Sequence, residues 1–266
     1  MTQTITMRSR CAAQSVIEEL LRENALTRPR SPLARFFGVS PLSAASVPWY
    51  TAALGEIAVA ALLAELPPGW AVFHAVPMAG RGQDIGHIVV GPGGVFVIST
   101  RHHRGEYAWV GGSVLLVSGQ ERDYLAGAES EAEWVTTLIR GRMPLREPAR
   151  GVIALVGPRH IAIRRGPRRV TVLDARTLRG WLLAVPEVLS AADAREVVAL
   201  LDDPAVWGIA DPLPPEQLMR QFTAVDTEVR AARVRRVDWA LIGGALVAVA
   251  FCTAAPFLLG ALMVLV

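Results

Sequence analysis

Residues 84–101 constrain the fold of this chain more than any other stretch, because two β-branched runs flank a short glycine-rich break. The runs are residues 84–90 and 95–101, and Gly91-Pro92-Gly93-Gly94 joins them. Glycines supply the positive φ values that a tight turn requires, and β-branched residues pack well in strands. The stretch is therefore predicted to form a β-hairpin.

Helical and strand patterns around the hairpin follow the order of an α/β domain. Residues 51–66, rich in Ala and Leu, predict a helix that ends at Pro67 and is apolar enough to require burial. Residues 152–156 form a continuous apolar run, which is typical of a strand covered on both faces, and the strand is predicted at 151–156. Further strands are predicted at 71–76, 114–117 and 170–173, and further helices at 123–140, 176–184 and 191–201. We expect one sheet between helices.

Several short motifs occur in a fixed order over residues 49–201. They are Gly55-Glu56, residues 87–92, residues 94–98, Gly105, Gly119 and a Glu/Ala-rich helix at 129–138. This ordered set resembles the nuclease-related domain (NERD) family, which belongs to the PD-(D/E)xK nuclease fold, and residues 170–189 are similar to its arginine-rich bacterial members. The resemblance implies an α/β fold, with a mixed sheet flanked by helices, and descent from a metal-dependent nuclease.

Three positions depart from the family's pattern, and all three carry the chemistry. The family has an Asp before the His of the hairpin, an acidic residue after it, and a Lys two positions later. This chain has Gly86, Ser99 and Arg101 at those places. A nuclease of this kind holds Mg²⁺, which prefers carboxylate oxygens and activates a water. The resemblance therefore implies a degenerate site.

Two nearby carboxylates remain as weak candidates for a metal ligand. The strand period of two puts Asp84 on the same face as Gly86, and Glu56 lies on the preceding helix. The alternative is structural: Asp84 is a strand-edge residue, and Glu56 is an acid favoured by the helix dipole. Arg101 stays charged and cannot act as a base, although all 27 basic residues are arginine, so this exchange alone carries little weight.

The C-terminal end predicts a membrane anchor. Residues 239–266 form a run of 28 residues without a charge, which at ~1.5 Å per residue crosses a hydrocarbon core of ~30 Å. Pro256 divides the run, but neither half spans the bilayer alone, so one transmembrane helix is expected. Arginines precede the run and no charge follows it, which places the soluble part in the cytoplasm. No apolar segment follows Arg8 and Arg10, so no cleavable signal peptide is expected.

The chain is thus expected to have four parts. Residues 1–48 comprise an amphipathic helix at 11–26 and a proline-rich linker, in which Phe36 and Phe37 form one anchoring point. Residues 49–203 form the nuclease-like domain, residues 204–237 a helical stalk, and residues 238–266 the transmembrane helix.

A cluster of arginines between two predicted strands stands out against a modest net charge of +3, which shows no global nucleic-acid footprint. Arg159, Arg164, Arg165, Arg168 and Arg169 are interpreted as a basic loop. Such a loop binds phosphates of nucleic acid or anionic lipid headgroups, or it is a solvated hairpin tip.

The sequence is compatible with two functions. The first is a membrane-anchored cytoplasmic domain without catalysis or cofactor, which acts as a binding or assembly module, with nucleic acid as one candidate partner. The second is a tethered Mg²⁺-dependent nuclease, in which Glu56, Asp84 and a migrated acid such as Glu106 rebuild the site. Carboxylates within ~5 Å of one point favour the second function.

Overall fold

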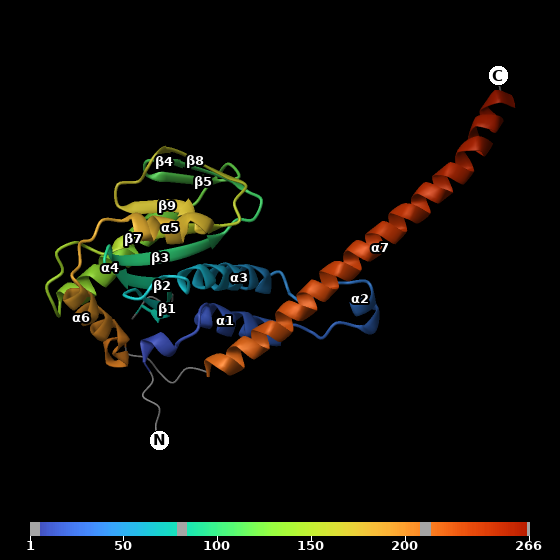
Figure 1. The fold of residues 1–266 in the computed structure, drawn as a ribbon. Helices are drawn as coiled ribbons and strands as arrows, with labels where there is room; N and C mark the ends of the chain where they lie inside the picture. The colour runs from blue at the N-terminus through green and yellow to red at the C-terminus, as the bar shows by residue number, and fades with distance from the viewer. Residues whose placement is uncertain (1–5, 79–83, 208–213, 265–266) are drawn as a thin grey trace. The chain divides into compact units, whose positions relative to one another are not determined.

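The computed structural model describes residues 6–78, 84–207 and 214–264 and divides into two compact units (Figure 1). The first unit comprises Met1–Leu20 and Val47–Met219, and the second comprises Leu21–Ser46 and Arg220–Val266. Each unit has its own internal contacts and is described by itself.

The first unit is built on a five-stranded mixed sheet. Its strands are β1 (Ala71–Pro77), β2 (Asp84–Gly91), β3 (Gly94–His102), β7 (Arg150–Val156) and β9 (Val170–Asp174), in the spatial order β1-β2-β3-β7-β9. β1, β2 and β3 are antiparallel, whereas β3, β7 and β9 are parallel. The predicted hairpin is thus present, and Gly94 takes the positive φ of +118° at its turn.

Helices cover both faces of this sheet. Val59 of α3 (Ser46–Leu63) and Leu182 of α5 (Leu178–Ala184) share one core cluster with Ile98 of β3. Val135 of α4 (Tyr124–Arg140) and Val197 of α6 (Ala191–Asp202) pack against the opposite face. The short helices η1 (Met7–Ser9), η2 (Ala175–Thr177) and η3 (Pro204–Val206) and helix α1 (Gln14–Ala25) complete the set. The expected mixed sheet between helices is therefore present.

A second mixed sheet is the feature that the sequence did not predict. It contains β4 (Tyr107–Gly111), β5 (Val114–Val117), β6 (Gln120–Glu121) and β8 (His160–Arg165), in the order β6-β5-β4-β8. Ala108 and Leu115 of this sheet share a core cluster with Leu155 of β7. The interpretation of Arg164 and Arg165 as loop residues is therefore wrong, since both end a strand. An edge strand tolerates charged side chains, and β8 is largely exposed.

Helix α3 is less buried than its composition predicted. Ala53, Val59 and Leu63 are buried, but Ala58 and Ala61 are exposed. Alanine exposes little apolar area, so an Ala-rich helix needs only one buried face. The predicted burial therefore holds for one face of this helix.

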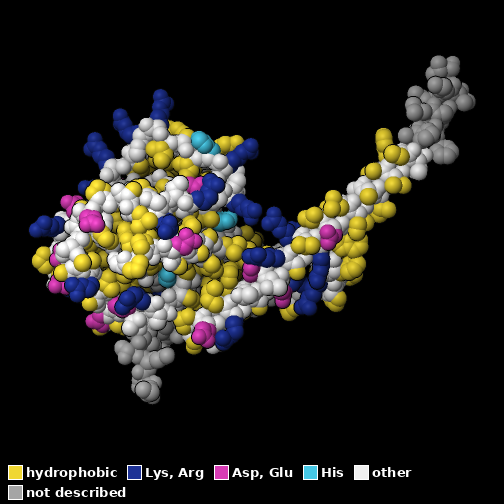
Figure 2. Space-filling model, viewed as in Figure 1, with side chains coloured by type: hydrophobic (Ala, Val, Ile, Leu, Met, Phe, Trp, Pro, Cys, Tyr) yellow, Lys and Arg dark blue, Asp and Glu magenta, His cyan; other side chains and the backbone are white. Residues whose placement is uncertain are grey.

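The second unit combines α2 (Pro32–Phe36) with the greater part of α7 (Pro215–Val264). Among the described residues, α3 and the Pro215–Thr253 stretch of α7 are long and apolar enough to cross a membrane. Packing on the sheet accounts for α3, whereas the most apolar window of α7 is not buried at all. In Figure 2 a cluster of arginines on α7 is followed, toward the C-terminus, by a stretch with many hydrophobic side chains. The C-terminal apolar helix is thus a candidate membrane span.

Candidate functional site

The three departures from the nuclease pattern lie together on the β2–β3 hairpin. Gly86 is on β2, while Ser99 and Arg101 are on β3. His87 pairs with Ile98, so Gly86 and Ser99 lie at the same level of neighbouring strands. The hairpin register therefore assembles these positions into one site, and helices α3 and α4 supply carboxylates to it.

Glu56 reaches this site from α3. A Cβ atom added to Gly86 would lie 3.6 Å from the Glu56 carboxylate, so the absence of a side chain leaves room beside it. Burial raises the pKa of Glu56 to about 7, and the negative charge of Asp84 adds to the effect, while Arg101 and the Ala13 backbone N–H oppose it. The Glu56 carboxyl group is thus partly protonated near neutral pH.

Glu131 approaches the site from α4, and the sequence reasoning did not single it out. The Ser99 hydroxyl donates a hydrogen bond to the Glu131 carboxylate. Burial raises the pKa of Glu131, while Ser99 and Arg101 oppose that shift. A signal was available, since helical spacing places residue 131 on the same face as the buried Ala128 and Val135. A carboxylate on a core-facing stripe requires a specific partner.

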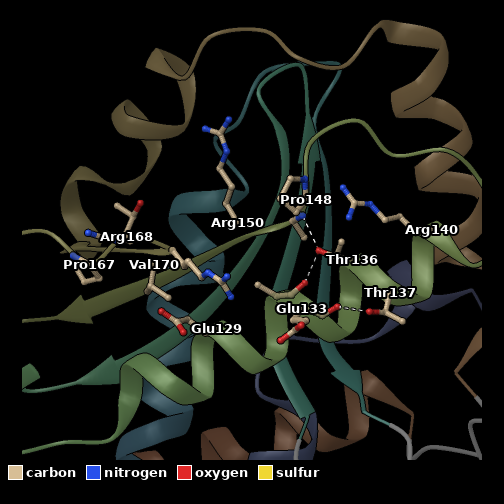
Figure 3. A pocket seen from close by; sticks show the side chains of 14 residues that line it. Glu129, Glu133, Thr136, Thr137, Arg140, Pro148, Arg150, Pro167, Arg168 and Val170 are labelled. Carbon is tan, nitrogen blue, oxygen red and sulfur yellow. Dashed lines mark hydrogen bonds between the residues drawn. The ribbon is translucent and has the colours of Figure 1, made fainter. Parts of the chain in front are cut away.

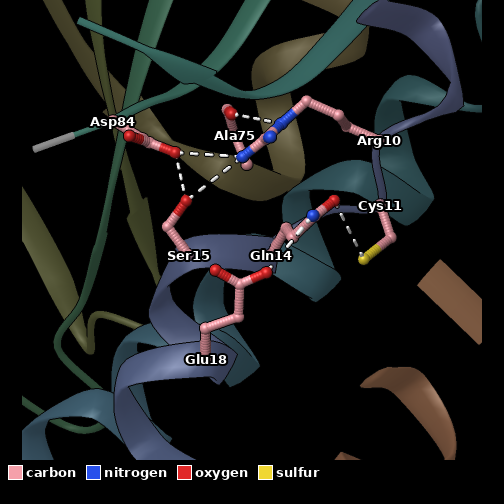
Figure 4. Close-up of polar contacts among 7 residues, drawn as sticks. All are labelled: Arg10, Cys11, Gln14, Ser15, Glu18, Ala75 and Asp84. Carbon is pink, nitrogen blue, oxygen red and sulfur yellow. Dashed lines mark hydrogen bonds and ion pairs between the residues drawn. The ribbon is translucent and has the colours of Figure 1, made fainter. Parts of the chain in front are cut away.

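Asp84 is tied to the N-terminal segment (Figure 4). The Ser15 hydroxyl donates to its carboxylate, and the Arg10 guanidinium lies 3.2 Å from the same oxygen. Arg10 also donates to the Ala75 carbonyl at 2.8 Å. Burial raises the pKa of Asp84, although Ser15 and Arg10 partly offset the shift. Asp84 therefore serves as the partner of a buried arginine.

Arg101 supplies the positive charge at the centre of the site. Its guanidinium carbon lies 4.7 Å from the centroid of the Tyr124 ring, a cation–π geometry. Its charge lowers the pKa of both Glu56 and Glu131. Its buried Nε has no hydrogen-bond partner among the described residues.

The residues present do not fit the divalent ion of a PD-(D/E)xK nuclease. No group of three His, Cys, Asp or Glu residues in the described ranges is arranged to hold a metal ion. Asp84 is paired with Arg10, and the charge of Arg101 acts on Glu56 and Glu131. Arginines therefore provide the countercharge to these carboxylates, the role a metal ion takes in a nuclease.

Glu106, the migrated acid that we considered, lies elsewhere. Its carboxylate is 2.6 Å from His103 Nδ1 and accepts a hydrogen bond from Ser118. Glu106 is also absent from the charges that shift the pKa of Glu56. The structure brings Glu56 near Asp84 and Glu131, and it does not bring Glu106 to them.

Two histidines, the buried His87 and the partly buried His74, form a pair beside the site. The Nδ1 atoms of His74 and His87 are 2.9 Å apart, so one ring donates and the other accepts. Burial lowers the pKa of His74, and burial together with His74 lowers that of His87 well below its usual value. Two neutral rings satisfy this geometry, which assigns the pair a structural role.

A separate groove of about 570 Å³ gathers arginines from three elements (Figure 3). Its arginines are Arg140 on α4, Arg150 on β7, and Arg168 and Arg169 just before β9. Glu129 and Glu133 on α4 also line it. Thr136 links α4 to the residue that precedes β7, since its hydroxyl accepts a hydrogen bond from the Ala149 N–H at 2.9 Å. Of the predicted basic loop, only Arg168 and Arg169 belong to this groove, and Arg140 and Arg150 were not foreseen.

Fold and site together define a mixed α/β domain of nuclease-like architecture with carboxylates beside its central hairpin. Residues 51–156 match the family model described as NERD, nuclease-related domain. The chain thus contains a nuclease-related domain over that range. No curated protein and no solved structure matched the chain significantly.

Proposed function

We propose that the nuclease-related domain of this protein has lost phosphodiester cleavage and acts as a membrane-anchored binding module for a phosphate-rich polyanion, with nucleic acid as the favoured ligand. The main observation in support of lost cleavage is that arginines balance the charges of the carboxylates at the site. Arg101 acts on Glu56 and Glu131, and Arg10 pairs with Asp84. A divalent ion entering this site must displace fixed guanidinium charges, which costs electrostatic energy.

Side-chain chemistry supports the same conclusion. Gly86 and Ser99 provide no carboxylate, and a nuclease needs more than one to hold Mg²⁺. Arg101 remains protonated in proteins and cannot take a proton from water. The domain therefore retains the framework of a nuclease without its reactive groups.

The arginine groove supports the binding role. Arg150, Arg168 and Arg169 form no ion pair among the described residues, although Glu129 and Glu133 lie in the same groove. Four arginines against two glutamates leave the groove positive. Guanidinium groups bind phosphates through paired hydrogen bonds, which suits a phosphodiester backbone.

Membrane anchoring completes the proposal. The uncharged part of α7 begins at Trp239, and Arg230, Arg233, Arg235 and Arg236 precede it. A span flanked by arginines on one side orients with that side in the cytoplasm. We assign α7 as a single-pass anchor, with the nuclease-related domain on the cytoplasmic side.

Cleavage is tested with the full chain purified in detergent. The chain is incubated with single- and double-stranded DNA and with RNA, with Mg²⁺ or Mn²⁺ present, and binding of each ion is measured by titration calorimetry. We expect no metal-dependent cleavage and no saturable ion binding. Cleavage by the wild-type chain that Glu56→Gln or Glu131→Gln abolishes would establish the rival, a metal-dependent nuclease with a migrated carboxylate.

Binding is tested with matched arginine variants. Arg168→Ser with Arg169→Ser removes two groove arginines, whereas Arg164→Ser with Arg165→Ser removes two exposed arginines of β8 outside it. We expect the groove variant to weaken binding to nucleic acid and to flatten its salt dependence much more than the β8 variant. If both variants weaken binding equally, the overall charge of the protein and not the groove accounts for the binding. No binding by the wild-type chain would contradict the proposal.

A further inference from the structure

In the second unit, residues 30–39 fold back onto α7 at the start of its apolar stretch. The Trp239 indole N–H donates to the Phe36 carbonyl at 2.9 Å. The Phe36 and Phe37 ring centroids lie 4.9 and 5.1 Å from that of Trp239, and 5.2 Å from each other. Three aromatic rings thus form one cluster at the residue where the uncharged run of α7 begins.

Arginines fasten the segment to α7. Arg236 donates two hydrogen bonds to the Gly38 carbonyl, at 3.1 and 3.2 Å. Arg235 donates to the Arg35 carbonyl at 3.2 Å. Arg30, at the other end of the segment, forms an ion pair with Glu228 and donates to the Val39 carbonyl. The attachment therefore has a specific geometry rather than only apolar contact.

Gly38 permits the close approach that this geometry requires. A Cβ atom on Gly38 would lie 2.5 Å from the Ala232 carbonyl oxygen and 2.6 Å from the Arg236 nitrogen. Gly38 also has a φ of +72°, a left-handed conformation that glycine adopts readily. Any larger residue at position 38 must push the segment off the helix.

The attached segment presents apolar side chains to its surroundings. Leu33, Phe36 and Phe37 are 69%, 55% and 50% exposed. Large apolar side chains that gather on a surface mark a contact with a partner or a membrane. The fastened segment thus carries an exposed apolar surface beside a candidate membrane span.

The position of this surface identifies its partner as a bilayer. It lies at the first residue of a run of 28 residues without charge, with Arg233, Arg235 and Arg236 within two turns before it. Trp and other amphipathic aromatic groups favour the boundary between headgroups and acyl chains, and arginines favour the headgroup layer. Aromatic rings and arginines occur here in the order in which a helix entering a membrane meets those layers.

We propose that residues 30–39 and Trp239 form an interfacial collar, which inserts Leu33, Phe36 and Phe37 into the headgroup boundary of the bilayer and sets the depth of the α7 span. The inference rests on the proposed anchoring of α7. It adds a second membrane contact, remote in sequence from the span, which holds the start of the uncharged run of α7 in a defined position.

The test uses the full chain in proteoliposomes of phosphatidylcholine and phosphatidylglycerol. Cys11 and Cys252 are changed to Ser, and one cysteine is introduced by Leu33→Cys or, as an exposed apolar control on α5, by Leu183→Cys. An environment-sensitive fluorophore is attached, and lipids brominated near the headgroups serve as quenchers. We expect several-fold stronger quenching at position 33 than at position 183. Equal quenching at both positions would overturn the collar as a specific contact.

A second variant tests the attachment to α7. Gly38→Val, in the Leu33→Cys background, should detach the segment and lower the quenching several-fold, while the chain remains resistant to carbonate extraction. Unchanged quenching would show that the segment enters the membrane without α7 and would contradict the collar. If the parent chain is itself released by carbonate, the anchoring of α7 fails. If it stays in the membrane and position 33 is not quenched, only the collar fails.

Discussion

The Ser99 hydroxyl donates a hydrogen bond to the Glu131 carboxylate, and this contact joins β3 to α4 beside Gly86 on the neighbouring strand. Ser99 is buried, and burial raises the pKa of Glu131. A carboxylate at position 99 would meet Glu131 directly. The contact therefore places a hydroxyl, rather than a second carboxylate, against the carboxylate of the facing helix.

If the proposed loss of cleavage is correct, substituting the three residues of the nuclease-like pattern should create a new site for a divalent ion. Gly86→Asp, Ser99→Glu and Arg101→Lys together place new carboxylates beside Glu56 and Glu131, and their mutual repulsion should lower the unfolding temperature in the absence of a divalent ion. Mg²⁺ or Mn²⁺ should then raise it, because the ion neutralises the cluster. Thermal unfolding of the full chain in detergent, with and without the ion, measures this. Arg101→Lys alone should show no ion dependence, and a similar ion response in the wild type would contradict the prediction.

Glu56 should reduce the stability of the domain at alkaline pH. Its pKa is raised from 4.5 to about 7 in the folded state, so its contribution to stability is fully present below pH ~4.5 and is lost as the pH rises through 7. Glu56→Gln keeps the shape and removes the titration. The variant should match the wild type near pH 4 and exceed it by about 3 kcal/mol near pH 8. Chemical denaturation at the two pH values tests this, and an equal difference at both would contradict it.

The His74–His87 pair should act in the opposite direction. Burial lowers both pKa values, so the contribution of the pair is present above the unfolded pKa of ~6.5 and is lost as the pH falls. In the Glu56→Gln background the unfolding temperature should therefore decrease between pH 7.5 and pH 5. His74→Asn with His87→Asn should flatten that dependence, because an amide pair keeps a hydrogen bond without titrating. His160→Gln, at an exposed position, is the control and should leave the decrease intact.

The orientation of α7 can be read with reporter fusions. An enzyme that is active only outside the cytoplasm should be active when fused after Val266 and silent when fused before Met1, since the arginines precede the span. Changing Arg230, Arg233, Arg235 and Arg236 to Ser should weaken this asymmetry. Activity at the N-terminal fusion alone would reverse the orientation.

Local patterns were sufficient to predict most of the first unit. β-Branched runs around glycine predicted the β2–β3 hairpin, and local helical composition predicted α4 and α6, because these signals depend on neighbours along the chain. The second sheet was missed, since β8 presents arginines at an exposed edge and only its pairing with β4 identifies it as a strand. The arginine groove was only half foreseen for a similar reason, because Arg140 and Arg150 reach it from distant elements.

By itself, the sequence determined which side chains are present: no carboxylate at positions 86 and 99, arginine at position 101, and an uncharged run from Trp239. Only the tertiary structure decided what surrounds them. Glu131 accepts a hydrogen bond from Ser99, Arg10 pairs with Asp84, and the Phe36 carbonyl accepts a hydrogen bond from Trp239. These contacts join residues that are 32, 74 and 203 positions apart in the sequence. Such contacts arise where buried charges and aromatic rings find partners during packing, and patterns between neighbours along the chain do not specify which distant residues will meet.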